Sequence, residues 1–279
     1  MFLKLDESQY SMAEDLFYYG GLESVFAFAV TEKKIPGRIF VDDTEEPKSA
    51  LICSFQGKYL VTGDESNSAF NSSVAEFLLN PDNHIEFYDL YASSEEWIEV
   101  LSGFLNGQAV ILRFTVYHSN NIQNLPAAES SLPAEDDLEL KQIDEALFNQ
   151  IVNEFYPSYK NLWADAGSFC SNSFGFCIVK GSELLSVAAS RYTGGGYAEI
   201  DIETSPYYYR KGFAFNLGRQ FIEYCRNSGL TALWICDSKN KASHALAQKL
   251  GFTKSKEVEM LWWHQSRGAM NGYLNKFGY

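Results

Sequence analysis

Two cations and a glycine stand where a strand pattern gives way to a helix pattern in the second half of the chain. The strand pattern "YAEIDIET" covers 197–204, and Arg210, Lys211 and Gly212 precede an amphipathic stretch at 213–227. The first N–H groups of a helix have no partners within the helix and lie at the positive end of its dipole. A phosphate placed there accepts several charge-assisted hydrogen bonds, and the missing side chain of Gly212 allows a close approach. The pattern therefore predicts a site for phosphate or diphosphate with two cations at its rim.

Two carboxylates lie on the strand pattern just before this turn. Glu199 and Asp201 are two residues apart, so they project from the same face of a strand. Neighbouring carboxylates raise each other's pKa and attract a cationic amine. Glu199 is therefore a candidate general base, and Asp201 is a second catalytic candidate. The alternative is that both belong to the solvated face of a surface strand.

The histidines and cysteines are not spaced as they are in metal or redox sites. Four scattered histidines without ligand spacing predict no metal site. The cysteines are odd in number and form no CxxC pair, so we expect free buried thiols in a reducing compartment. No run approaches 18 apolar residues, and the first residues lack a signal-peptide layout. We therefore expect a cytoplasmic protein that does not cross a membrane.

The second half must position these residues through alternating helices and strands. Hydrophobic periodicity predicts the elements in this order: helix 144–156, strands 174–179, 184–190 and 197–204, helix 213–227, strand 231–236, helix 240–250 and strand 252–263. The short turns "KGSE" and "TGGG" separate the first three strands, which favours an antiparallel meander.

The first half has nearly the same order of elements. The patterns predict helix 8–18, strands 25–30, 38–43, 49–55 and 58–62, helix 67–79, strand 84–90, helix 94–104 and strand 108–117. Where the second half carries "PYYYRKGFA", the first carries "GDESNSAF", with two acids and no basic glycine turn. If both halves share a fold, only the second keeps an anion site.

Charge divides the chain at the same place. Residues 1–136 hold 7 Lys and Arg against 22 Asp and Glu, a net charge of 7 − 22 = −15, and residues 137–279 hold 15 against 14, a net charge of +1. The polar stretch 121–136 suits a linker, so we expect an acidic N-terminal domain at 1–120 and a second domain at 137–279. Such an acidic chain disfavours nucleic acid or an anionic membrane as a partner.

The turn and a later block resemble the GNAT family of N-acetyltransferases. "RKGFA" opening a helix after a strand is similar to the family's acetyl-CoA pyrophosphate motif, Gln/Arg-x-x-Gly-x-Gly/Ala. "DSKNKASHALAQKLGF" at 237–252 resembles the family's Asn-led helix, which ends in Leu-Gly-Phe. With "GRIFVDDTEEPKSALI" at 37–52, the chain resembles a two-lobed bacterial subgroup that includes the zwittermicin-resistance type. The resemblance implies an α+β or α/β fold, with a mixed sheet flanked by helices in the C-terminal domain and a degenerate GNAT-like N-terminal domain.

The resemblance also implies a set of cofactor-binding residues. Acetyl-CoA is the implied cofactor, held at its pyrophosphate by the turn and the first helical residues. The residues implied for the whole cofactor are Ile202, Thr204, Arg210, Lys211, Gly212, Phe213, Ala214, Asn240 and Ser243, with Ile202 and Thr204 acting through main-chain groups. Ser243 is also a catalytic candidate through a hydrogen bond to the cofactor.

Two positions depart from the family pattern. Tyr209 stands where the family has Gln or Arg, and Ala247 stands where many members carry the tyrosine that protonates the leaving thiolate. His244 or a tyrosine of 207–209 is an alternative acid.

The implied function is transfer of an acetyl group from acetyl-CoA to a primary amine of a small, cationic acceptor, with the acidic lobe favouring the cation. The alternative is a non-catalytic acyl-CoA-binding or interaction module. The oligomeric state stays open, and we expect a monomer or a dimer.

Overall fold

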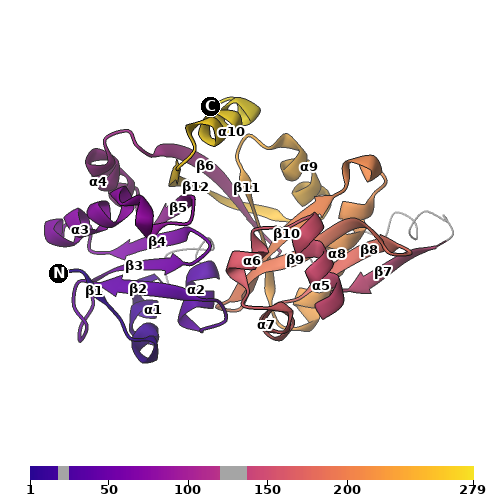
Figure 1. Ribbon diagram of the computed structural model, residues 1–279, viewed down its shortest axis with the longest axis horizontal. Coiled ribbons are helices and arrows are strands. Elements are labelled where there is room, and N and C mark those ends of the chain that lie inside the picture. Colours follow the sequence, from indigo (N-terminus) through magenta and orange to yellow (C-terminus); the bar gives the residue numbers. More distant parts are fainter. Residues whose placement is uncertain (18–24, 120–136) are drawn as a thin grey trace. The chain divides into compact units, whose positions relative to one another are not determined.

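The computed structural model describes residues 1–17, 25–119 and 137–279, which divide into two compact units (Figure 1). The first unit contains residues 1–115, 237–240 and 257–279, and the second contains 116–236 and 241–256. The expected linker at 121–136 lies outside the described residues. Within those residues, no helix has the length and apolar character needed to cross a lipid bilayer.

The first unit is a mixed sheet with helices. Its strands are β1 (Leu3–Lys4), β2 (Gly37–Val41), β3 (Ser49–Ser54), β4 (Lys58–Gly63), β5 (Phe87–Ala92), most of β6 (Val110–His118) and most of β12 (Thr253–His264), in the spatial order β1-β2-β3-β4-β5-β12-β6. Its helices are η1 (Glu7–Ala13), α1 (Glu14–Phe17), α2 (Val25–Thr31), α3 (Ser68–Leu79), η3 (Pro81–Asn83), α4 (Glu95–Leu105) and α10 (Arg267–Phe277). Strands β2, β3 and β4 pair antiparallel, and β4 pairs parallel with β5 through the crossover helix α3. The core of this unit is rich in aromatic side chains, with Trp97 and Tyr88 almost completely buried.

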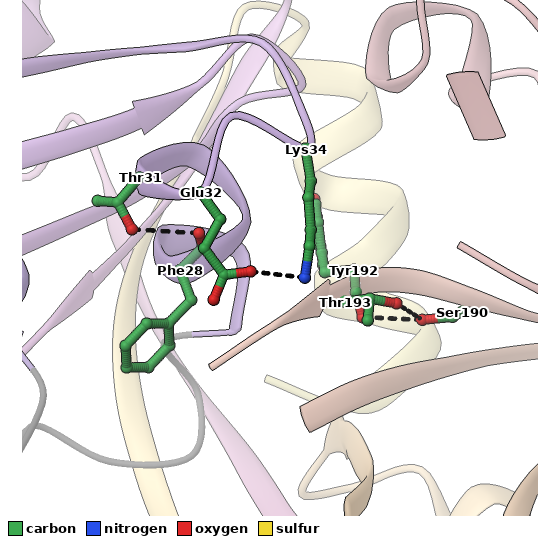
Figure 2. A network of polar contacts seen from close by, with 7 residues as sticks. All are labelled: Phe28, Thr31, Glu32, Lys34, Ser190, Tyr192 and Thr193. Carbon is green, nitrogen blue, oxygen red and sulfur yellow. Dashed lines mark hydrogen bonds and ion pairs between the residues drawn. The ribbon is translucent and has the colours of Figure 1, made fainter. Parts of the chain in front are cut away.

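The predicted strand at 25–30 is wrong, because this segment forms helix α2. Every residue of α2 is buried, so the run "VFAFAV" is apolar on all sides. A short apolar run of this kind has no polar face, and its periodicity cannot separate a buried strand from a buried helix. At the end of α2, Thr31 Oγ1 donates to the Phe28 carbonyl at 3.1 Å, and Lys34 pairs with Glu32 at 2.6 Å (Figure 2).

The second unit is a meander followed by helix α8 (Phe213–Asn227), strand β11 (Thr231–Asp237) and helix α9 (Lys241–Lys249). Its strands are β7 (Leu138–Gln142), β8 (Gly175–Lys180), β9 (Glu183–Gly194), β10 (Tyr197–Thr204) and β11 (Thr231–Asp237), in the spatial order β11-β10-β9-β8-β7. Its helices are α5 (Glu145–Glu154), α6 (Tyr159–Leu162), α7 (Ala166–Asn172), η4 (Pro206–Tyr208), α8 (Phe213–Asn227) and α9 (Lys241–Lys249). The predicted antiparallel meander is confirmed for β8, β9 and β10, and β10 pairs parallel with β11. Gly195 and Gly196 both have positive φ in the tight turn between β9 and β10.

Helix α8 lies against the meander and closes the core of the second unit (Figure 1). Phe213, Leu217 and Phe221 face the sheet at helical spacing and are at most 1% exposed. Gly218 lets Leu250 approach the same helix, since a Cβ on Gly218 would stand 2.5 Å from Leu250 Cδ1. The helix that carries the predicted anion site is therefore fixed by its buried face.

The sequence patterns did not identify β7, α6, α7 and α10. The residues of β12 and α10 from 257 onward also pack with the first unit, whereas we expected them in the second domain. The reason is strand pairing: β12 is antiparallel to β5, with Leu261 opposite Leu90 in the core of the first unit. The free cysteines are confirmed; four are buried as expected, but Cys170 is exposed.

Candidate active site

The first turn of helix α8 is open, and no side chain caps it. Gly212 is the N-cap residue, with φ 82° and no side-chain hydrogen bond to the helix amides. The first described helical bond at this end runs from Asn216 N to the Gly212 carbonyl at 3.1 Å. A Cβ built on Gly212 would meet no described atom within 4 Å, so the approach to the turn is unobstructed. Phe213 contributes only its main chain here, because its side chain is buried.

Basic residues surround this turn. Arg210 is exposed and has φ 64°, a left-handed conformation that is uncommon for a residue with a side chain. Lys211 Nζ lies 5.2 Å from the centre of the Tyr208 ring, and Tyr208 OH donates to Glu183 at 2.9 Å. Lys249 Nζ lies 4.7 Å from the ring of Phe215, the third residue of α8. An anion at the turn would therefore find helix amides and cations together.

The corresponding helix of the first unit has the opposite character. Helix α3 also follows the first strand of a parallel pair, but its N-cap residue Asn67 accepts from Phe70 N at 3.1 Å. The Asn67 amide nitrogen in turn donates to Asp42 at 3.0 Å, and Asp64 lies in the same turn. The Phe70 N–H therefore already has an acceptor, and the side chains around it are negatively charged. This end of α3 is unsuited to a phosphate, as the contrast between "GDESNSAF" and "PYYYRKGFA" indicates.

Strands β10 and β11 separate before they end. Their parallel pairing runs only from Tyr197 with Thr231 to Glu199 with Leu233, while β10 continues to Thr204 and β11 to Asp237. In the first unit, β4 and β5 stay paired up to Ala92, the last residue of β5. Residues 200–204 of β10 therefore have an edge that β11 does not cover.

The main-chain groups of Ile202 and Thr204 face this uncovered edge. Ser205 N donates to the Leu185 carbonyl on the β9 side at 2.9 Å, and the Glu203 carbonyl also accepts a hydrogen bond from that side. Main-chain groups of successive residues point to alternate sides of an antiparallel strand. The groups of 202 and 204 consequently point away from β9, as an extended cofactor arm would require.

A β-bulge lies beside the candidate base. Glu199 is opposite Tyr192 and Ile200 is opposite Ser190, so the strand register shifts by one residue at Arg191. Ser190 Oγ donates to the Tyr192 carbonyl at 2.8 Å and lies 2.9 Å from Thr193 Oγ1 (Figure 2). These two contacts connect the residues on either side of Arg191. Bulges redirect side chains and are frequent beside active sites.

Glu199 and Asp201 lie on the sheet face that is opposite α8. Ala198 and Ile200 belong to the core under α8, so the alternate residues 199 and 201 project to the other face. Glu199 is only 5% exposed. Asp201 Oδ2 accepts from Tyr159 OH at 3.5 Å and lies 3.9 Å from Arg191 NH1.

Two buried tyrosines accompany these carboxylates. Tyr156 and Tyr159 stack with their ring centres 4.9 Å apart. Burial, followed by the negative charge of Asp201, raises the pKa of both phenols well above its usual value. Both hydroxyls therefore stay protonated and can donate hydrogen bonds beside the carboxylates.

The later block places its residues around helix α9. Asn240 directly precedes α9, and its N–H donates to the Asp237 carbonyl at 2.9 Å. Ser243 Oγ accepts from Trp234 Nε1 at 2.8 Å, which fixes the position of the hydroxyl. His244 Nδ1 lies 2.6 Å from Tyr117 OH, so His244 has a specific partner.

Sequence reasoning missed Tyr117, Tyr156, Tyr159 and Arg191. Tyr117 is 127 residues from His244, and Tyr159 is 42 residues from Asp201, so no local spacing connects them. In the described ranges, no three His, Cys, Asp or Glu side chains are grouped so that they could hold a metal ion.

The chain is similar to known proteins of one family. The family model described as GNAT acetyltransferase matches residues 18–261. The uncharacterized N-acetyltransferase YdfB of Bacillus subtilis (strain 168) is 30% identical over 227 residues, which are 81% of this chain and 85% of that protein.

Solved structures share the fold over nearly the whole chain. The GCN5-related N-acetyltransferase-like protein from Streptococcus suis 89/1591 matches with a TM-score of 0.70 at 19% identity, covering 92% of this chain and 99% of that one. A tandem GNAT protein from the clavulanic acid biosynthesis pathway matches with a TM-score of 0.62 at 12% identity, covering 95% and 98%. The predicted fold class is confirmed, and the chain belongs to the GNAT acetyltransferase family, whose members are acetyl-CoA-dependent N-acetyltransferases.

Proposed function

We propose that the second unit transfers the acetyl group of acetyl-CoA to a primary amine of a small, cationic acceptor, which attacks the thioester directly. The observation that carries this proposal is the open first turn of α8, which follows a strand whose end β11 leaves uncovered. A diphosphate and an extended arm require these two features side by side along one stretch of chain.

The fit to acetyl-CoA rests on main-chain groups and nearby cations. The amides of Gly212, Phe213 and Ala214 would bind the diphosphate, with Arg210 and Lys211 adding positive charge. The main-chain groups of Ile202 and Thr204 would bind the arm along β10, and the roles of Asn240 and Ser243 stay predictions from the family resemblance. When bound, acetyl-CoA would supply an acetyl thioester: the acceptor nitrogen would bond to the acetyl carbon, the C–S bond would break, and CoA would leave as the thiolate and take up a proton.

Glu199 is the proposed general base. A free alkylammonium has a pKa of about 10.4, so the acceptor must lose a proton before its nitrogen can attack. Glu199 is buried beside Asp201, and with Arg191 3.9 Å from Asp201 the group keeps a net negative charge that favours a cationic amine at this place. Glu199 accepts the amine proton, Asp201 holds the cation through its charge, and strand N–H groups stabilise negative charge on the thioester oxygen.

The first unit is proposed to be a degenerate copy that binds no diphosphate. Its support is the side-chain cap by Asn67 on α3, the acidic Asp42 beside that cap, and strands β4 and β5 that stay paired to the end of β5.

Replacing Glu199 by Gln tests the proposed base. Acetyl-CoA turnover should be measured against a panel of primary amines from pH 6 to pH 10. Glu199→Gln should lower kcat/KM by about 10²- to 10⁴-fold at neutral pH, because positioned general bases contribute that much, with a smaller loss at high pH where the amine is already neutral.

Glu203→Gln is the matched control, since Glu203 lies on the same strand face and is exposed. It should leave the pH profile unchanged. A Glu199→Gln enzyme with the wild-type pH profile would remove Glu199 as the base.

A further inference from the structure

Two tyrosine side chains are exposed on the turn between β10 and α8. Tyr207 is 91% exposed and Tyr209 is 59% exposed, which makes them the two most exposed aromatic side chains in the described part of the chain. Within the described residues, neither ring packs on another ring and neither hydroxyl makes a hydrogen bond. An aromatic ring stabilises a fold through the large area that it buries. These two rings bury little of their area, so their faces are open to a ligand.

The turn that carries the two rings has a fixed backbone. Pro206 begins the short helix η4, and Tyr208 N donates to the Ser205 carbonyl at 2.8 Å. The side chain of Tyr208 points inward: its hydroxyl donates to Glu183 at 2.9 Å, and its ring stacks on Phe213 with the ring centres 6.2 Å apart. The residue between the two exposed tyrosines is therefore anchored. This anchor holds the chain on either side of it in place while the two rings stay in solvent.

The exposed rings lie close to the proposed diphosphate site. Tyr209 is three residues before Gly212, so their Cα atoms are at most about 11 Å apart. Arg210 and Lys211 lie between them, and both are exposed. In CoA, a single ribose joins the diphosphate to an adenine base. A diphosphate bound at Gly212 would therefore bring the adenine within reach of the two rings.

The identity of residue 209 fits a base better than a phosphate. Tyr209 stands where the family has Gln or Arg, and a tyrosine cannot supply the positive charge of an arginine. Its ring instead offers a π face, on which a nucleic-acid base stacks. Removing one ring from such a stack weakens binding about 5- to 150-fold. The departure from the family pattern thus exchanges a polar contact for aromatic surface.

We propose that Tyr207 and Tyr209 form a stacking site for the adenine base of acetyl-CoA. The two rings contact the base, while the first amides of α8 bind the diphosphate next to it. This inference rests on the proposed function, because it requires the diphosphate on the α8 turn. It adds recognition of the adenine to a reaction that takes place at the other end of the cofactor.

Paired variants and two ligands test the stacking site. Tyr207→Leu combined with Tyr209→Leu keeps apolar side chains and removes both π faces. In calorimetry on the full chain, this leucine pair should raise the Kd of CoA at least about fivefold. Phosphopantetheine lacks the adenosine and should bind the leucine pair as it binds the wild type. Tyr207→Phe combined with Tyr209→Phe keeps both rings and should bind both ligands like the wild type.

NMR detects the stack itself. Ring currents should move the adenine protons of CoA upfield on binding to the wild type and to the phenylalanine pair, and the leucine pair should lose this shift. In turnover, the leucine pair should raise KM for acetyl-CoA and leave kcat unchanged, because the adenine is remote from the thioester.

A ring of the first unit provides the matched control. Phe104 on α4 is 45% exposed, and Phe104→Leu removes an exposed ring from outside the turn. This variant should bind CoA and phosphopantetheine like the wild type. All the variants should unfold at the wild-type temperature, because the replaced side chains are exposed.

The outcomes separate this inference from the proposed function. A leucine pair that binds CoA like the wild type, or that loses CoA and phosphopantetheine to the same extent, would overturn the adenine site. Adenine protons that do not shift on binding would overturn it too. In these cases the diphosphate site still stands if Gly212→Ala weakens CoA. A wild-type chain that binds no CoA would overturn the inference and the proposed function together.

Discussion

Adding a single methyl group at Gly212 should abolish most CoA binding without unfolding the protein. Gly212 has φ 82°, and a Cβ there would meet no described atom within 4 Å. Gly212→Ala therefore introduces no clash, and its cost to folding is the left-handed backbone conformation, about 1–2 kcal/mol. In the bound complex, the same methyl group would stand at the approach to the first amides of α8.

The other end of the same helix offers a matched control. Gly229 follows α8, has φ 70°, and is equally open around its Cβ position. Gly229→Ala should lower the free energy of unfolding by the same 1–2 kcal/mol or so, because the backbone conformation is the same type. Only the Gly212 variant should lose charge-assisted hydrogen bonds to the diphosphate, at about 1.5–3 kcal/mol for each bond. One lost bond raises the Kd about 10- to 150-fold.

Two measurements are needed. Thermal or denaturant unfolding without ligand should give the same loss of stability for both variants, and calorimetry with CoA should show weakened binding for Gly212→Ala alone. If Gly212→Ala binds CoA like the wild type, or if Gly229→Ala weakens binding equally, the placement of the diphosphate on this turn is refuted.

Two further predictions concern stability. Burial lowers the pKa of His84, so the folded state favours the neutral ring, while the unfolded chain titrates near about 6.5. Below about pH 6.5 the unfolded state therefore binds more protons than the folded state, so the free energy of unfolding measured with denaturant should fall as the pH drops. His84→Gln should make the free energy of unfolding depend less on pH. An unchanged dependence on pH would contradict the reasoning. Gly218→Ala should destabilise by about 1–3 kcal/mol because its Cβ would overlap Leu250 Cδ1. Gly272→Ala in α10 has open space and should stabilise by about 1 kcal/mol, so melting temperatures that move in the same direction would contradict the packing argument.

Local signals made the strand and the helix on either side of Gly212 predictable. The helix after Gly212 begins and ends where periodicity placed it, at 213–227, and the strand before it matches at 197–204. Helix α2 shows the limit of such signals, because a run that is buried on every side has no period to read. The pairing of β12 with β5 depends on contacts between distant segments, which no local pattern encodes.

The residues of the candidate site also differ in whether local sequence could suggest them. Glycine, charge and strand alternation made Gly212 and Glu199 candidates from nearby residues alone. The bulge at Arg191 has no signature in the sequence, and Tyr159 meets Asp201 only because α6 packs on the sheet. Features within a single turn or strand could therefore be predicted from the sequence. Side chains that other elements bring to the site could not.

A crystal structure with bound acetyl-CoA would show where the diphosphate binds. We expect diphosphate oxygens within hydrogen-bond distance of the amides at 212–214, with the arm lying along residues 202–204 of β10. Density for the diphosphate elsewhere on the chain, with those amides facing only water, would contradict it.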